Sequence, residues 1–288
     1  MKNNSKSGLI FTSPFYILFL TFMVYPILFS FYLSFNKWNG VGEMEWVGLA
    51  NYINLFRDDL VWKSMFNALF FFFTYVPIML FLALILAVFL NSNIKGRGFF
   101  RAAVYLPNIT SLVAVAFTFQ LLLDKNYGLL NMLLSYLGVS SINWLGTPLG
   151  ARISIDFLMI WRWLGYNTII LLAGLQSIPE ELYEAAIIDG ANKIQSFFRI
   201  TVPLMKPVLL FTLVLSTIGT FRMFTEVFIL TGGGPANSTL TPVVHLYNTG
   251  FNWFKFGYAS SITYLIILIT LILSLVQMKL LNEKEVKN

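Results

Sequence analysis

The amino-acid sequence predicts an all-α, polytopic membrane protein with six transmembrane helices. Of its 288 residues, 57% are hydrophobic and only 11% are charged, whereas soluble domains are about half apolar and about one-quarter charged. The apolar residues also gather in six long stretches, and a helix needs about 20 consecutive apolar residues to span a bilayer. Charges this scarce cannot cover a water-exposed surface, which excludes the class of soluble globular proteins.

The six stretches carry few internal charges. The first, second, third and sixth contain none, the fourth contains Arg162, and the fifth contains Arg222 and Glu226. The first stretch is too long for a removed signal peptide, and no small-residue cleavage site follows it. We expect one transmembrane domain over 1–288, because no linker or low-complexity run divides the chain. We place the spans at about 9–35, 65–90, 102–123, 157–175, 207–230 and 258–278.

The distribution of lysine and arginine predicts the orientation. The connections on the side of both termini carry eleven of these residues, and the connections on the other side carry six in longer loops. Cytoplasmic loops are enriched in lysine and arginine, so both termini and the loop at 176–206 are expected in the cytoplasm. This bias, together with anionic lipid head groups, accounts for the formal charge of +6 without nucleic acid as a partner.

The composition also limits the chemistry. The chain has no cysteine and a single histidine, His245, which excludes disulfides, thiolate metal sites and the usual clusters of two or three histidines. No Gly-x-x-x-x-Gly-Lys-Ser/Thr phosphate-binding loop occurs. We therefore predict no catalytic residue, no metal and no cofactor. If ATP drives this protein, another polypeptide must bind it.

A polar insert, 176–206, separates the fourth and fifth spans. Ser177 and Glu180 have the spacing of a capping box, so a helix is expected to start there. Gly190 allows the left-handed turn that ends such a helix.

A second short helix is expected after this turn, because Asn192 and Gln195 repeat the cap pattern and Pro203 would stop it. An alternative is an amphipathic helix lying on the membrane surface, which would be rich in lysine and arginine. The insert instead begins with an acidic cluster of Glu180, Glu181 and Glu184. The acidic cluster favours a rigid projection made of two short helices on the cytoplasmic face.

Inside the insert stands Glu184-Ala185-Ala186, then three residues, Gly190, nine residues and Ile200-Thr201-Val202-Pro203. This spacing resembles the EAA loop of the membrane-spanning subunits of ATP-binding-cassette importers, in which a leucine stands at the position of Val202. The resemblance implies that the loop docks onto a cytosolic ATPase and transmits its movement to the spans. The ATPase-coupling residues that it implies are Glu184, Ala185, Ala186, Asp189, Gly190 and Pro203.

Segments outside the insert extend the resemblance. Gly48-Leu49-Ala50-Asn51-Tyr52 precedes the second span, and Thr231-Gly232-Gly233-Gly234-Pro235 follows the fifth. Both are similar to the first of the two dissimilar permeases in importers of the maltose, glycerol-phosphate and oligosaccharide type. The resemblance implies a multi-pass permease in the cytoplasmic membrane (inner or plasma membrane) of a bacterium or archaeon.

The same resemblance implies a heterocomplex. Its expected partners are a second, dissimilar permease, two cytosolic ATPase subunits or one homodimer, and an extracytoplasmic solute-binding protein. The substrate would be an oligosaccharide or sugar derivative, and the chain would form half of its translocation pathway. ATP hydrolysis would belong to the partner, so the chain itself is expected to be a transport subunit and not an enzyme.

Polar residues within the spans are candidates for lining the pathway, because an ionisable side chain in a span usually faces protein or water. Arg162 could hydrogen-bond sugar hydroxyls or instead snorkel outward. Arg222 and Glu226 are four positions apart and would share a helix face, either as a structural ion pair or as sugar contacts. The candidates are Arg162, Tyr166, Asn167, Arg222 and Glu226.

Three other functions compete with a carbohydrate importer. An importer of the same architecture for a peptide, amino acid or polyol would lack the carbohydrate-type outer segments. A self-sufficient secondary transporter would often show internal repeats, and a membrane enzyme acting on lipid-linked sugar would need a cluster of Asp, Glu or His at a membrane face. The sequence shows neither feature, so a carbohydrate permease is favoured.

Overall fold

The computed structural model describes residues 4–92 and 94–282. Helices dominate this part of the chain, as predicted, and its sheet consists of two short antiparallel strands, β1 (Asn36–Lys37) and β2 (Glu45–Trp46). The chain forms two compact units. The first unit comprises the residues up to Trp62 together with His245–Ile267, and the second comprises Lys63–Val244 together with the residues from Leu268 onward.

The first unit is held together by polar contacts at the ends of its helices. Asn51 Nδ2 donates to the carbonyl oxygens of Ser34 (2.8 Å) and Asn36 (2.9 Å). Gly257 must be a glycine, because a Cβ at this position would lie 1.8 Å from the carbonyl oxygen of Asn36. The elements of this unit are α1 (Asn4–Phe19), the π-helical turn η1 (Leu20–Val24), α2 (Tyr25–Leu33), β1, β2, α3 (Ala50–Arg57), the first turn of α4 (Asp59–Asn91), the end of α14 (Pro242–Tyr247), the π-helical turn η3 (Asn248–Asn252) and the first part of α15 (Phe256–Asn282).

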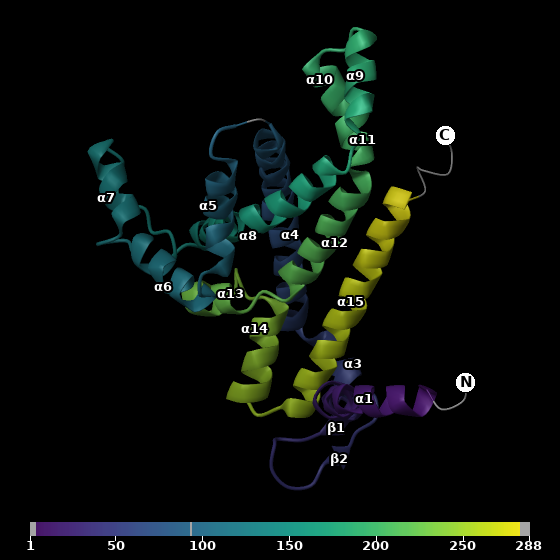
Figure 1. Ribbon diagram of the computed structural model, residues 1–288. Helices are drawn as coiled ribbons and strands as arrows, with labels where there is room; N and C mark the ends of the chain where they lie inside the picture. Colours follow the sequence, from purple (N-terminus) through teal and green to yellow (C-terminus); the bar gives the residue numbers. More distant parts are fainter. Residues whose placement is uncertain (1–3, 93, 283–288) are drawn as a thin grey trace. The chain divides into compact units, whose positions relative to one another are not determined.

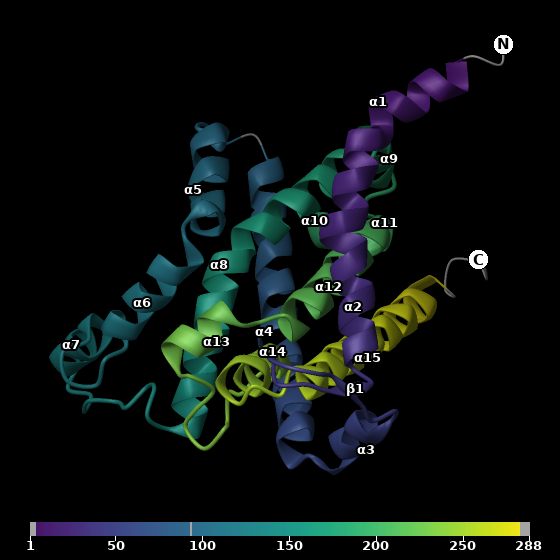
Figure 2. The same cartoon turned by 90° about the horizontal axis from the view of Figure 1, so that it is seen from below.

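The second unit is built around α8 (Figures 1 and 2). Helix α5 packs along α8, α13 packs against α6 and α8, and α12 packs against α8. Gly165 allows the α5–α8 contact, because a Cβ there would lie 1.8 Å from the carbonyl oxygen of Val104. Besides the rest of α4, α14 and α15, the elements are α5 (Arg97–Ile109), α6 (Leu112–Leu122), α7 (Leu129–Tyr136), α8 (Pro148–Gln176), α9 (Glu180–Ile188), α10 (Lys193–Ser196), the π-helical turn η2 (Phe197–Thr201), α11 (Val202–Leu204), α12 (Lys206–Phe221) and α13 (Thr225–Leu230).

Four helical segments are long and apolar enough to cross a membrane. They are Phe11–Leu33, Asp59–Asn91, Pro148–Gln176 and Phe256–Leu280. Two further candidates are bent helix pairs, Arg97–Ile109 with Leu112–Leu122 and Lys193–Leu204 with Lys206–Phe221, which bend by 90° and 62°. The described chain therefore has four candidate spans, or six if each bent pair is one span.

Two of the predicted spans are not continuous helices. The span at 102–123 breaks at Thr110 and Ser111, where the backbone is extended (ψ 151° and 120°). The span at 207–230 ends at Phe221 and resumes as the separate helix α13 at Thr225. At both breaks, side chains distant in the sequence bind carbonyl groups within the break, as described below.

Candidate functional site

The insert between α8 and α12 folds into two short helical segments joined by a tight turn (Figure 1). Helix α9 ends in a Schellman motif, in which Ala191 N–H donates to Ala186 O (2.8 Å) and Gly190 N–H donates to Ile187 O (3.0 Å). Gly190 has a φ of +80°, which glycine adopts without steric cost. The glycine turn predicted from the sequence is present.

The second segment starts with the predicted capping box. Gln195 N–H donates to Asn192 Oδ1, and Asn192 N–H donates to Gln195 Oε1, each at 2.9 Å. The helical path then continues through η2 and α11 to Leu204 and bends at Met205. Pro203 therefore does not stop it; it lies in the first turn of α11, where the missing N–H of proline is tolerated.

The cap predicted at Ser177 is also wrong. Its hydroxyl donates to Gly174 O at 2.7 Å and so ends α8. Helix α9 begins after Pro179 without a side-chain cap. An acidic first turn remains, with Glu180 and Glu181 near the positive helix end.

The predicted coupling residues lie on the surface of this loop. Glu184, Ala185, Asp189 and Gly190 are exposed, whereas Ala186 and Pro203 are half-buried. Large apolar side chains beside them are also exposed, since Ile188 is 85% exposed, Ile194 70% and Phe198 66%. A group of exposed apolar side chains on a polar loop is typical of a surface that contacts another protein.

The base of the loop is packed firmly. Met205, at the bend below α11, is fully buried in a cluster with α4 and α8 side chains. Tyr183 in α9 also packs on this cluster, and its hydroxyl lies 2.8 Å from Thr201 Oγ1 in η2. The other buried members of the cluster are Ala83, Ala87, Leu90, Leu171, Leu172, Leu175 and Ile178. The base of the loop is therefore packed against α4, α8 and α12.

A cavity of about 410 Å³ lies among α4, α6, α8, α12 and α13. Four of the five predicted pathway residues line it, namely Tyr166, Asn167, Arg222 and Glu226. The remaining lining residues that carry an aromatic ring or a polar side chain are Tyr75, Trp163, Ser216, Phe224 and Thr225. The structure thus brings together side chains from both sides of the α12–α13 break.

Aromatic and amide groups in this cavity are held in place by local contacts. The rings of Trp163 and Tyr166 meet edge to face, with centroids 5.6 Å apart. Asn167 Nδ2 donates to Trp163 O at 3.0 Å. The hydroxyl of Tyr75 lies 2.7 Å from Thr220 Oγ1.

Arg162, the fifth predicted pathway residue, is placed at the break between α5 and α6. Its Nη1 donates to the carbonyl oxygens of Thr110 (3.2 Å) and Pro107 (3.4 Å). These carbonyl groups lie at the end of α5, where helical partners are missing. Arg162 therefore binds carbonyl groups that the break leaves without helical partners, and it does not line the cavity.

Arg222 and Glu226 do not share a helix face, contrary to the prediction. Helix α12 ends before Arg222, whose backbone has left the helical region (φ −95°, ψ 3°), and Glu226 belongs to α13. Arg222 is exposed and Glu226 is 5% exposed, and no ion pair joins them in the described structure. Glu226 instead accepts hydrogen bonds from its own backbone N–H and that of Phe224, and it interacts electrostatically with Arg162.

Sequence reasoning missed Tyr75 and Phe224 as lining residues. A tyrosine in an apolar span needs a partner for its hydroxyl, and this signal could have marked Tyr75. Phe224 had no such signal, because its position depends on a break in a segment, 221–225, that contains neither proline nor glycine.

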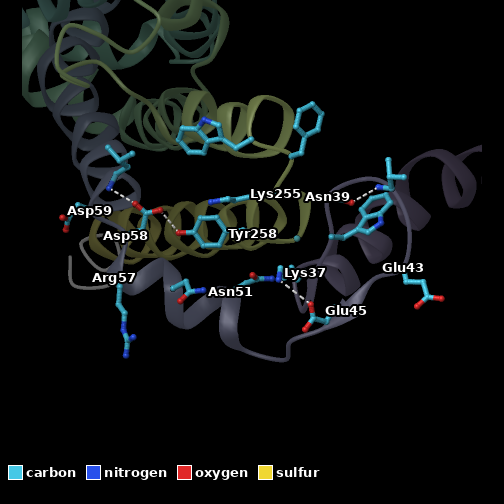
Figure 3. Close-up of a pocket in the computed structure, with 17 residues that line it drawn as sticks. Lys37, Asn39, Glu43, Glu45, Asn51, Arg57, Asp58, Asp59, Lys255 and Tyr258 are labelled. Carbon is cyan, nitrogen blue, oxygen red and sulfur yellow. Dashed lines mark hydrogen bonds and ion pairs between the residues drawn. The ribbon is translucent and has the colours of Figure 1, made fainter.

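The first unit has a larger cavity of its own, of about 1130 Å³ (Figure 3). Figure 3 shows Asp58 and Tyr258 pointing toward each other, and the Tyr258 hydroxyl donates to Asp58 Oδ2 at 2.7 Å. Asp58 Oδ1 also accepts from Leu60 N–H at 2.9 Å, which caps the start of α4. Lys37 and Glu45 also line the cavity and form an ion pair of 3.7 Å. No residue predicted as part of a site lines this cavity.

His245 lies next to Asp58 in the same unit. It is 1% exposed, and its Nε2 is 3.8 Å from Asp58 Oδ2, too far for a hydrogen bond. Burial lowers the pKa of His245 below its ordinary value, and the nearby Asp58 carboxylate opposes this shift only in part. Over the described residues, no group of three His, Asp or Glu side chains could hold a metal ion.

Membrane helices, a protruding two-helix loop and a cavity of mixed polarity define a membrane transport protein. The chain belongs to the family described as the binding-protein-dependent transport system inner membrane component, whose model matches residues 47–287. It is therefore an inner-membrane permease, a transport subunit and not an enzyme.

Curated relatives match nearly the whole chain. The lactose transport system permease protein LacF of Rhizobium radiobacter is 39% identical over 97% of this chain and 95% of its own length. The trehalose/maltose transport system permease protein MalF of Thermococcus litoralis is 38% identical over 96% and 93%. The arabinooligosaccharides transport system permease protein AraP of Bacillus subtilis is 38% identical over 94% and 87%.

A solved structure shares the fold. A chain of a bacterial ABC transporter involved in the import of the acidic polysaccharide alginate superposes with a TM-score of 0.84 at 23% identity, over 98% of both chains. At this identity the likeness concerns the fold alone. It shows that the two chains share an arrangement of helices over nearly their whole length.

Proposed function

We propose that the chain is the permease subunit of an ATP-driven, binding-protein-dependent importer of carbohydrate. The observation that carries this proposal is the set of relatives that match over most of their length and are named for lactose, trehalose or maltose, and arabinooligosaccharides. The proposed substrate is an oligosaccharide or a sugar derivative. The chain forms half of the translocation pathway and does no chemistry on the sugar.

The cavity of the second unit is the proposed sugar-contacting part of the pathway. Trp163 and Tyr166 offer aromatic faces with polar tips, which suits a ring that has both apolar C–H faces and hydroxyl groups. Asn167, Arg222 and Glu226 add hydrogen-bonding groups from three segments of the wall. A few placed polar groups in a largely apolar cavity is the usual composition of a small-molecule site. Arg162 binds the α5–α6 break and is not part of this proposed site.

The α9–α11 loop is the proposed contact with a cytosolic ATPase. Glu184, Ala185, Ala186, Asp189 and Gly190 would form the docking surface, with Pro203 at its base. The exposed apolar side chains of Ile188, Ile194 and Phe198 support a protein partner there. The buried cluster around Met205 would carry the displacement to the helices that line the cavity.

The proposed assembly contains a second, dissimilar permease, two ATPase subunits or one homodimer, and an extracytoplasmic solute-binding protein. The proposed topology is a single transmembrane domain of six spans, in which α5 and α6 together form the third span and α12 and α13 together form the fifth. Both termini and the α9–α11 loop would face the cytoplasm, in line with the excess of lysine and arginine on that side.

Purification of the tagged full chain in mild detergent tests the proposal. We expect a second permease and an ATPase to copurify, and ATP turnover by the complex in liposomes to rise when a sugar-loaded binding protein is added. Stimulation by a peptide or amino acid but by no sugar would refute the substrate class. Accumulation of solute by this chain alone, without an ATPase, would refute the importer mechanism.

A further inference from the structure

A loop that the proposed function leaves unused lies between α13 and α14. We call this segment, Thr231–Thr241, the glycine loop. Three side chains from α4 and α8 bind its backbone by donating hydrogen bonds to carbonyl oxygens at four positions of the loop. The donors are Lys63, Asn67 and Arg152, and the acceptors are Ala236, Asn237, Ser238 and Leu240.

Asn67 is the centre of this contact. It is fully buried, and its Nδ2 donates to Asn237 O (2.9 Å) and Leu240 O (3.0 Å). Its Oδ1 accepts from Arg152 Nη2 at 3.0 Å. The amide nitrogen and the amide oxygen of Asn67 are therefore both hydrogen-bonded, which fixes the orientation of the side chain.

Arg152 completes the contact from α8. Its Nε donates to Ser238 O at 2.9 Å, while its guanidinium carbon lies 4.4 Å from the centroid of the Phe70 ring. The planar guanidinium thus binds a carbonyl, an amide and an aromatic face at once. A lysine cannot reproduce this set of contacts, because it lacks the planar fork of donors.

The backbone that these side chains hold is strained. Ala236 and Asn237 both have positive φ, of 50° and 56°, a region that an alanine rarely adopts. Their carbonyl oxygens are bound by Lys63 (2.8 Å) and Asn67 (2.9 Å). Such conformations persist only where surrounding contacts impose them, and they gather at functional sites.

The glycine loop is tied to the wall of the sugar cavity at both of its ends. Thr241 Oγ1 donates to Met223 O at 2.7 Å, within the break between α12 and α13, and Met223 lines the cavity. Thr231 Oγ1 donates to Val227 O at 3.0 Å and also lies 2.8 Å from Thr239 Oγ1. The conformation of the loop therefore constrains α13, the helix that places Glu226 in the cavity.

We propose that Arg152 and Asn67 are positioning residues for the translocation cavity. They hold the glycine loop, the loop holds the α12–α13 break through Thr241, and the break sets the positions of Phe224, Thr225 and Glu226. This inference rests on the proposed carbohydrate import. Neither residue lines the cavity itself, so each acts on the sugar only through the wall.

Transport kinetics of the whole importer test this assignment. We expect Arg152→Gln and Asn67→Ala to raise the half-saturation concentration for sugar-stimulated ATP turnover about tenfold, equivalent to about 1.4 kcal/mol. Arg152→Lys should not restore it. Lys125→Gln removes an exposed charge from a different outer connection and should leave it unchanged.

A double-mutant cycle separates positioning from general stability. Thr241→Val removes the hydroxyl that binds Met223 O with little change in volume, and we expect it to raise the half-saturation concentration as well. Because both changes act through one chain of contacts, combining it with Arg152→Gln should add little further effect. Fully additive effects, or loss of assembled complex with an unchanged half-saturation concentration, would overturn the proposal.

A direct reporter is available because the chain has no cysteine. Thr225→Cys places a single thiol on the cavity wall of this subunit. Its rate of modification by a water-soluble maleimide should change at least severalfold when Arg152→Gln is added, and not when Lys125→Gln is added. An unchanged rate would refute the positioning role even if sugar import is established. Failure of the parent importer to respond to any sugar would refute the proposed function instead.

Discussion

Arg162 shows how a charge within an apolar segment can serve the fold while it stands next to the functional site. Its guanidinium binds Thr110 O and Pro107 O at the end of α5. We expect Arg162→Leu to lower the stability of the assembled importer by about 1 kcal/mol, because Thr110 O loses this donor while Pro107 O keeps the Thr110 hydroxyl. The half-saturation concentration for sugar should stay near the parent value. Thermal unfolding of the purified complex and sugar-dependent ATP turnover measure the two quantities.

Asn167→Ala is the matched comparison, since Asn167 lines the cavity one turn further along α8. It should raise the half-saturation concentration more than it lowers the unfolding temperature. The reverse pattern, with Arg162→Leu weakening sugar binding at unchanged stability, would place Arg162 in the pathway.

His245 contributes a dependence on pH that one substitution can isolate, because the chain has no other histidine. Burial lowers its pKa in the folded state, so this side chain binds a proton more readily in the unfolded state just below the ordinary pKa of about 6.5. The contribution of His245 to stability must then fall as the pH drops below that value. We expect the unfolding temperature of the purified protein to fall relative to that of His245→Gln as the pH decreases from about 7 to about 5. Parallel curves for the two proteins would contradict the assignment.

Among the elements, the turn after α9 depends on the backbone freedom of one residue. Gly190 has a φ of +80°, and a Cβ there would meet no atom within 4 Å, so the cost of a side chain is conformational and not steric. We expect Gly190→Ala to raise the conformational free energy of the folded turn by about 1–2 kcal/mol. This change should also weaken the binding of the ATPase to this chain. Gly190→Asn should be milder, because asparagine tolerates the left-handed region. Gly98→Ala, at an equally open position with ordinary φ, is the control, and equal losses in all three variants would refute this explanation.

Substitution of Glu184 tests whether the α9–α11 loop is the element that couples this chain to the ATPase. Its side chain is exposed, so Glu184→Lys should change folding stability by less than about 0.5 kcal/mol. Since the charge reversal lies on the proposed ATPase-docking surface, we expect the subunit to remain inserted while sugar uptake is lost and any ATP hydrolysis becomes independent of sugar. Glu43→Lys makes the same charge change at an exposed acid of the first unit and should be silent. Unchanged uptake in Glu184→Lys would count against the coupling role.

Local signals predicted some of the elements whose geometry is set locally, although the cap expected at Ser177 and the stop expected at Pro203 were wrong. Gly190 and the pair of Asn192 and Gln195 marked the turn and the cap correctly, because both depend on neighbouring backbone groups. The breaks within the predicted spans could not be found this way. One is bound by Arg162, 52 positions from Thr110, and the other by Thr241, 18 positions from Met223. An uninterrupted apolar stretch is predicted as one helix, because the sequence alone does not show which distant residues bind at a break.

The same distinction between local signals and long-range contacts explains why the cavity residues were predicted but their arrangement was not. Polarity within an apolar stretch was enough to select Tyr166, Asn167, Arg222 and Glu226, and all four line it. Their mutual geometry was not predictable, because the supposed helix face shared by Arg222 and Glu226 does not exist once α12 ends at Phe221.

At the scale of the whole molecule, the open quantity is the number of membrane crossings. The described chain has four long apolar helices and two bent pairs, and each bent pair is either one broken span or a re-entrant segment. Charge bias favours six crossings, because it places the connections around Lys95 and Lys193 on the cytoplasmic side and that around Lys125 on the outer side.

Single-cysteine labelling decides between these topologies, since the parent chain contributes no background thiol. Lys95, Lys125 and Lys193 are all exposed, so Lys95→Cys, Lys125→Cys and Lys193→Cys should fold normally. With a membrane-impermeant maleimide and the outer face of the membrane made accessible, we expect only Lys125→Cys to react. Lys95→Cys and Lys193→Cys should react after the membrane is permeabilised. Reaction of Lys95→Cys and Lys125→Cys from the same side would show that α5 and α6 form a re-entrant segment, and the proposed six-span topology would then be wrong.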